Sequence, residues 1–119
     1  MNIELFKYPS RTFRWRDRKG NFHIPAQMET RHLFMTLVLI WNHTMSDECG
    51  IDYSGTWKHH RYNLGPHYDM DYLCIAICSI ANELFTRDNL ESSWKATLHK
   101  MHLHLMERYK VRLLPCTVE

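Results

Sequence analysis

The sequence predicts an α+β protein in which an N-terminal β-hairpin packs on three α-helices. Two observations lead to this prediction. Between residues 11 and 25, apolar and basic side chains alternate on either side of a glycine-containing turn, and alternation with a period of two is typical of half-buried strands. After Pro25, apolar residues recur at helical spacing in three separate stretches, which indicates amphipathic helices. The 119 residues, of which 45% are hydrophobic, match one ordinary domain, so we expect a single domain over residues 1–119.

The predicted hairpin covers residues 11–25. Phe13 and Trp15 should lie on its buried face, and Arg14 and Arg16 on the opposite face, because neighbouring side chains of a strand point to opposite sides. The segment 17–20 supplies a turn whose glycine suits a positive φ angle. An extended run then resumes at residue 22 and stops at a proline.

The predicted helices cover residues 26–42, 69–86 and 89–108, with a long loop at 43–68 between the first two. The first helix is apolar on most faces, which is typical of a central, buried helix. Asp88 and Glu91 have the spacing of a capping box at the start of the third helix. Residues 109–114 alternate before Pro115 and are a candidate third strand for the hairpin.

Basic side chains gather in two places, although the net charge of the chain is only +2. Up to Arg31 there are seven basic residues against three acidic ones. A second basic group, interleaved with aromatic rings, lies in the long loop. Guanidinium groups pair with phosphates or carboxylates, and flat rings stack on bases. We therefore expect an anionic partner, either a nucleotide, a short nucleic acid or an acidic protein. The candidate binding residues are Arg14, Arg16, Arg18, Lys19, Arg31, Trp57, Lys58, His59, His60, Arg61, Tyr62 and His67.

No metal and no cofactor is predicted. Cys74 and Cys78 share one helix face, as do His99 and His102, so a zinc site from the two pairs is conceivable. However, the spacing is not that of a zinc finger, and the two cysteines lie among apolar residues, where thiols are ordinary core side chains. The four cysteines of the chain are expected to be free thiols.

The familiar catalytic motifs are missing from the sequence, including glycine-rich phosphate loops, nucleophile elbows and zinc-protease signatures. An acid–base pair could still be assembled from the histidines of the long loop and a neighbouring aspartate. A small enzyme that acts on nucleotides or nucleic acid therefore remains an alternative to a binding protein. The sequence also shows no secretory signal and no apolar run long enough for a membrane span, so a cytoplasmic, non-membrane protein is expected.

The segment from Trp15 to Trp41 resembles a recurrent segment of small phage proteins of unassigned function. The resemblance rests on a tryptophan, a turn glycine, a short apolar strand, and a methionine followed four residues later by His-Leu. These features fall here on Trp15, Gly20, Ile24, Met28, His32, Leu33 and Leu37. This chain departs from the pattern at Met35, where the family often has asparagine. The resemblance implies a phage origin, a strand–turn–strand–helix unit and a bacterial host cell, but no reaction.

The spacing within this segment leads to a further structural expectation. Met28 and His32 are one helical turn apart, so they should share a face at the start of the first helix. His32 is expected to hydrogen-bond the backbone of the hairpin.

Together these observations favour a phage accessory protein that inhibits a host function, such as a defence system, by binding. It would either sequester a nucleotide signal or mask a host protein. A nucleic-acid-binding module is the remaining alternative. Exposed aromatic side chains would also be compatible with a homo-oligomer.

Overall fold

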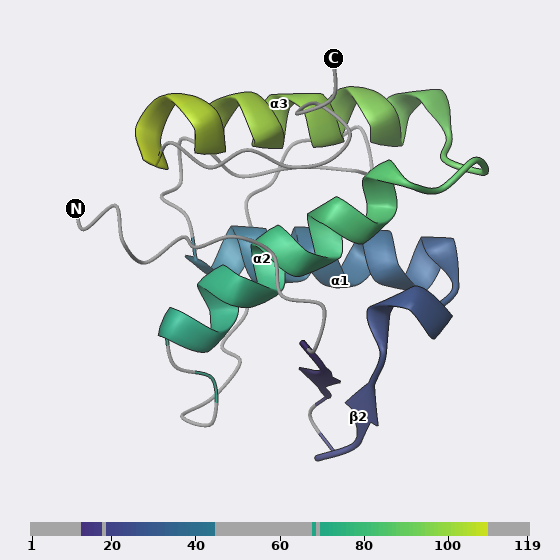
Figure 1. The fold of residues 1–119 in the computed structure, drawn as a ribbon, viewed down its shortest axis with the longest axis vertical. Helices are drawn as coiled ribbons and strands as arrows, with labels where there is room; N and C mark the ends of the chain where they lie inside the picture. The colour runs from purple at the N-terminus through teal and green to yellow at the C-terminus, as the bar shows by residue number, and fades with distance from the viewer. Residues whose placement is uncertain (1–12, 18, 45–67, 69, 110–119) are drawn as a thin grey trace.

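The computed structural model describes residues 13–17, 19–44, 68 and 70–109. A two-stranded antiparallel sheet precedes three helices (Figure 1). The elements are β1 (Trp15–Arg16), β2 (Phe22–His23), the 3-10 helix η2 (Pro25–Gln27), α1 (Thr30–Thr44), α2 (Met70–Phe85) and α3 (Ser92–Tyr109). The predicted α+β fold class is confirmed.

The hairpin is built around its turn. The Asp17 N–H donates to the Asn21 carbonyl at 2.8 Å, and the Gly20 N–H donates to the Asp17 carbonyl at 3.0 Å. Gly20 has a φ of 89°, a conformation that glycine adopts without steric cost. The Asp17 side chain strengthens the turn, because its Oδ1 accepts the backbone N–H groups of Lys19 and Asn21, both at 2.9 Å.

Helix α1 begins at Thr30, so the prediction that it begins at residue 26 was wrong. Pro25 opens a single 3-10 turn, in which Met28 N–H donates to the Pro25 carbonyl at 3.1 Å. Met28 then takes an extended conformation with φ −81° and ψ 145°, which interrupts the helix. The first α-helical bond runs from Leu33 N–H to the Glu29 carbonyl. Met28 consequently does not share a helix face with His32, contrary to the expectation from their spacing.

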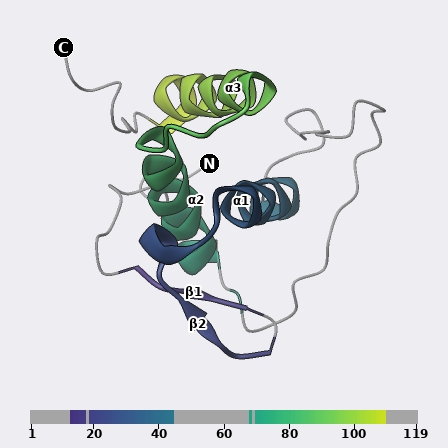
Figure 2. The same ribbon diagram turned by 90° about the vertical axis from the view of Figure 1, so that its right-hand side faces the viewer.

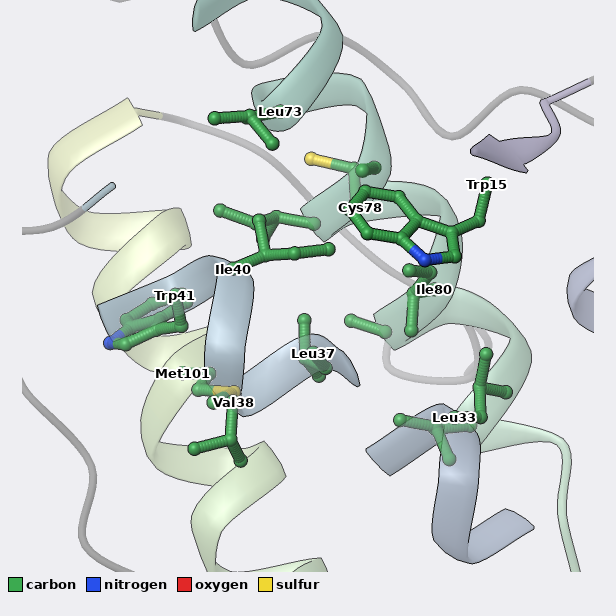
Figure 3. Close-up of a cluster of buried hydrophobic side chains, with 14 of the residues drawn as sticks. Trp15, Leu33, Leu37, Val38, Ile40, Trp41, Leu73, Cys78, Ile80 and Met101 are labelled. Carbon is green, nitrogen blue, oxygen red and sulfur yellow. The ribbon is translucent and has the colours of Figure 1, made fainter. Parts of the chain in front are cut away.

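Helices α1 and α2 lie side by side, and α3 covers them on the side away from the hairpin (Figures 1 and 2). The apolar stripes predicted for the three helices are buried as expected, and they meet in one core (Figure 3). Phe34 of α1 stacks on Trp94 of α3 with ring centroids 4.8 Å apart. The fully buried members of this core include Leu33, Leu37, Ile40, Trp41, Leu73, Ile77, Ile80, Leu84, Leu98, Met101 and Leu105.

Helix α3 begins at Ser92, three residues later than predicted. Its first helical bond runs from Lys95 N–H to the Glu91 carbonyl, so Asp88 lies before the helix and does not cap it. Nearby, Asn89 Oδ1 accepts a hydrogen bond from the Thr30 hydroxyl at 2.8 Å. This bond ties the connection between α2 and α3 to the start of α1, and the predicted capping box does not form.

Of the candidate third strand at 109–114, residue 109 is the last residue of α3, so this part of the prediction was wrong, and residues 110–114 lie outside the described residues. Most of the predicted long loop also lies outside them, although His43 and Thr44, placed in that loop by the prediction, belong to α1. None of the described helices combines the length and the apolar character that a bilayer crossing demands.

Candidate binding face on the β-hairpin

One face of the hairpin points away from the helices. Phe13 and Trp15 are buried, at 7% and 4% exposure, whereas Arg14 between them is exposed. Arg16 lies directly opposite Phe22 in the ladder, and residues opposite each other in an antiparallel pair share a face. Phe22 is 65% exposed. We call Arg14, Arg16 and Phe22 the outer face; it combines two guanidinium groups with one exposed ring.

Trp15 holds the inner side of the hairpin against the start of α2. Its ring stacks on Tyr68, with centroids 5.4 Å apart and 22° between planes, and on Tyr72, at 5.9 Å and 17°. Phe13 adds a tilted contact with Tyr72 at 5.3 Å. Offset aromatic pairs of this kind add to the free energy gained from burial. The hairpin is therefore docked through the ring of Trp15 in β1, the ring of Phe13 just before β1, and two tyrosines.

The same two tyrosines close the backbone edge of β1. The Tyr72 hydroxyl accepts the Arg16 N–H and donates to the Arg14 carbonyl, both at 2.7 Å. The Tyr68 hydroxyl donates to the Arg16 carbonyl at 2.8 Å. Desolvation raises the pKa of Tyr72, so this hydroxyl keeps its proton at neutral pH. Two side chains thus occupy positions that a neighbouring strand would otherwise fill. This role was not predicted from the sequence, because Tyr68 lies just before α2 and Tyr72 in its first turn, and only the tertiary structure brings both hydroxyls to β1.

The two arginines of the outer face are also held by local contacts. The Arg16 guanidinium carbon lies 5.3 Å from the centre of the Tyr68 ring, in cation–π geometry. An Arg14 guanidinium nitrogen donates to the Phe13 carbonyl at 2.9 Å. When long side chains are already restrained, less conformational entropy is lost on binding. The outer face is therefore partly pre-organised.

A carboxylate–imidazole pair connects the turn to β2. His23 Nε2 lies 2.8 Å from Asp17 Oδ2. The hydrogen bond from His23, together with the N–H groups of Asn21 and Lys19, holds the pKa of the Asp17 carboxyl below its usual value. The His23 ring also meets the exposed ring of His32 edge-on, with centroids 6.1 Å apart. His32 therefore touches the hairpin through a ring contact, where the sequence predicted a hydrogen bond to the backbone.

The other predicted binding residues are distributed differently. Lys19 is exposed in the turn, and Arg31 is exposed in the first turn of α1. Within the described part of the chain, Arg31 has no hydrogen bond or ion pair, so nothing joins it to the outer face. The remaining candidates fall outside the described residues, namely Arg18, Trp57, Lys58, His59, His60, Arg61, Tyr62 and His67.

The two pairs considered for zinc do not form a metal site. Cys74 and Cys78 are buried in the core, and burial raises the pKa of both thiols to about 12. His102 is buried against Phe85, while His99 is exposed. Across the described ranges, no group of three or more histidine, cysteine, aspartate or glutamate side chains is placed to hold a metal ion.

No protein-family model, curated protein or solved structure matches this chain significantly.

The two tyrosines differ in the number of backbone groups that they satisfy, and this difference can be measured. Tyr72→Phe leaves the Arg16 N–H and the Arg14 carbonyl without that partner, and should lower the free energy of unfolding by about 1–3 kcal/mol. Tyr68→Phe removes one hydrogen bond and should cost about 0.5–1.5 kcal/mol. Urea unfolding followed by circular dichroism measures both. A larger loss for Tyr68→Phe than for Tyr72→Phe would contradict the proposed division of roles.

Proposed function

We propose that this protein is a phage accessory protein that inhibits a host function by binding an anionic partner through the outer face of its hairpin. The observation that carries the proposal is the exposed Phe22 ring directly opposite Arg16 on a two-stranded ribbon. Aromatic and arginine residues dominate binding hot spots, so a phenylalanine and an arginine paired on one exposed face favour a binding role.

The surroundings of the outer face support binding. The ribbon that carries Arg14, Arg16 and Phe22 is docked by the stacked Trp15 ring and by three tyrosine hydrogen bonds. A surface that is held in place before binding loses little conformational entropy when a partner binds. Positive charge on this face would also steer an anionic partner toward it.

The phage origin and the host target rest on the resemblance of the segment from Trp15 to Trp41. That segment coincides with the hairpin, η2 and most of α1. It thus presents Arg16 and Phe22 of the outer face and connects them to the core. A host protein and a host nucleotide signal are the two kinds of partner that fit this proposal.

The test compares two triple variants that remove equal charge and one exposed apolar side chain each. Arg14→Gln/Arg16→Gln/Phe22→Ala alters the outer face. Lys95→Gln/Lys100→Gln/Leu103→Ala is the matched control on α3, where all three positions are exposed. Each variant is expressed in a bacterium that carries a defence system, and plaques of a sensitive phage are counted.

The wild-type chain and the α3 control should both raise the plaque count, whereas the outer-face variant should not. Circular dichroism checks that both variants remain folded. For an isolated partner, loss of the outer face should weaken binding roughly 100-fold, as expected for a few hot-spot residues. Equal plaque counts with the outer-face variant and the α3 control would refute a role for this face. If none of the three chains raises the plaque count in bacteria carrying any of several defence systems, the proposed function is wrong.

A further inference from the structure

The ladder register determines which backbone groups of the hairpin point outward. Trp15 pairs with His23 and Arg16 with Phe22, and the Asp17 N–H bonds the Asn21 carbonyl. Hydrogen-bonded and non-bonded pairs alternate along an antiparallel ladder. The pair of Arg16 and Phe22 is therefore the non-bonded one, and its N–H and C=O groups point to the two outer edges of the ribbon.

The two edges differ in whether their backbone groups are hydrogen-bonded. On the β1 edge, both backbone groups of Arg16 are bonded to tyrosine hydroxyls. On the β2 edge, the N–H and C=O of Phe22 have no hydrogen-bond partner among the described residues. An open edge is a template for another strand, and proteins commonly protect such edges when they have no partner. Here one edge is protected and the other carries an exposed phenylalanine.

We infer that the β2 edge receives an extended acidic segment of a partner protein, which adds as a third strand centred on Phe22. This inference rests on the proposed function and selects the protein branch of it. Strand addition takes its affinity from main-chain hydrogen bonds and its specificity from alternate side chains. The incoming residue opposite Phe22 would share the outer face with it, so an apolar side chain fits that position. Acidic side chains fit two residues to either side of it, because only alternate residues of a strand share a face.

Charge decides between the candidate occupants of the edge. From Phe13 to Ile24 the sequence has four basic residues and one acidic residue. A second copy of the chain would bring an equally basic hairpin against this one, and like charges across an interface are unfavourable. A nucleic acid would satisfy the arginines but offers no peptide groups for the backbone of Phe22. An acidic strand satisfies both the charge and the edge.

The experiment uses the full-length chain labelled with ¹⁵N and a heptapeptide capped at both ends. This Glu–Val peptide has Val at its centre, Glu at the second and sixth positions and Thr elsewhere, so that Val and both Glu side chains share one face. Three comparison probes are the same peptide N-methylated at the central residues, a Lys–Val peptide in which Lys replaces both Glu residues, and a short oligothymidylate. Chemical shifts and amide exchange are followed at Phe22, with Leu103 on α3 as the reference amide.

The Glu–Val peptide should slow exchange of the Phe22 amide and leave the amide of Leu103 unchanged. N-methylation, which removes the main-chain bonds, should weaken binding roughly tenfold. The Lys–Val peptide should not bind. Phe22→Ala should weaken binding of the Glu–Val peptide while preserving the fold, because the ring is exposed.

Several outcomes would overturn the inference and leave the proposed function standing. Equal binding of the methylated peptide would mean that the edge is not used. Binding of oligothymidylate with no response to the Glu–Val peptide would assign the outer face to nucleic acid. Protection of the Phe22 amide that grows with protein concentration alone would assign the edge to a second copy. If no anionic probe binds and the plaque assay also fails, both the inference and the proposed function are wrong.

Discussion

Trp15→Ala should lower the free energy of unfolding by about 3–5 kcal/mol, the range seen when a buried tryptophan is truncated. The side chain is only 4% exposed and stacks on both Tyr68 and Tyr72. Truncation would leave a cavity between the hairpin and α2. The rings that align the two tyrosine hydroxyls with β1 would also lose their packing partner. Natural domains of this size are stable by about 5–15 kcal/mol, so this single change would remove a large share of the total.

Phe22→Ala is the matched control for this variant. It truncates another aromatic side chain of the same hairpin, but one that is 65% exposed, and should change stability by less than about 0.5 kcal/mol. Urea unfolding monitored by far-UV circular dichroism measures both variants, and Trp15→Phe should give an intermediate value. A loss below about 1 kcal/mol for Trp15→Ala would show that the hairpin is not docked through this ring.

Arg87→Met should cost about 2–4 kcal/mol, because Arg87 joins three parts of the fold. Its Nε pairs with a Glu83 carboxylate oxygen at 3.0 Å, and its two terminal nitrogens donate to the Thr30 hydroxyl and to the Pro25 carbonyl, both at 2.9 Å. The side chain is 15% exposed. Hydrogen bonds that involve a charged group contribute about 1.5–3 kcal/mol each, and the acceptors left behind are partly buried.

Two comparisons make the Arg87 prediction specific. Arg87→Lys keeps the charge but cannot reach three acceptors in a planar arrangement, so it should recover only part of the loss. Arg108→Met makes the same exchange at an exposed position of α3 and should stay within about 0.5 kcal/mol of the parent. Thermal and urea unfolding provide the measurements. Equal stability of Arg87→Met and Arg108→Met would refute the role of Arg87 in joining α2 to η2 and α1.

The Arg87 contacts also explain why two helix boundaries could not be predicted. Thr30, which accepts from Arg87, donates to Asn89, so the start of α1 and the segment before α3 are bound to each other. Local signals favoured earlier starts for both helices, at residue 26 and at residue 89. Tertiary hydrogen bonds between residues 57 or more positions apart compete with those signals, and helix ends are where local preference is weakest.

Only part of the outer face could be predicted from the sequence. The alternation of Phe13, Arg14, Trp15 and Arg16 was enough to place the two arginines on the outer face. The exposure of Phe22 was not predictable, because its neighbours in sequence do not show which side of β2 the helices cover. Its partner across the ladder, Arg16, supplies that information only once the register is known.

The sequence by itself determined the elements of this protein: the alternating strand, the turn at Gly20, and three helices whose apolar stripes are buried in one core. These features depend on side chains within a few residues of each other, and local chemistry is sufficient for them. Only the tertiary structure decided that Tyr68 and Tyr72 close one edge of the hairpin and leave Phe22 on the other. Those hydrogen bonds join residues 52 to 58 positions apart, so they form only where α2 docks against β1.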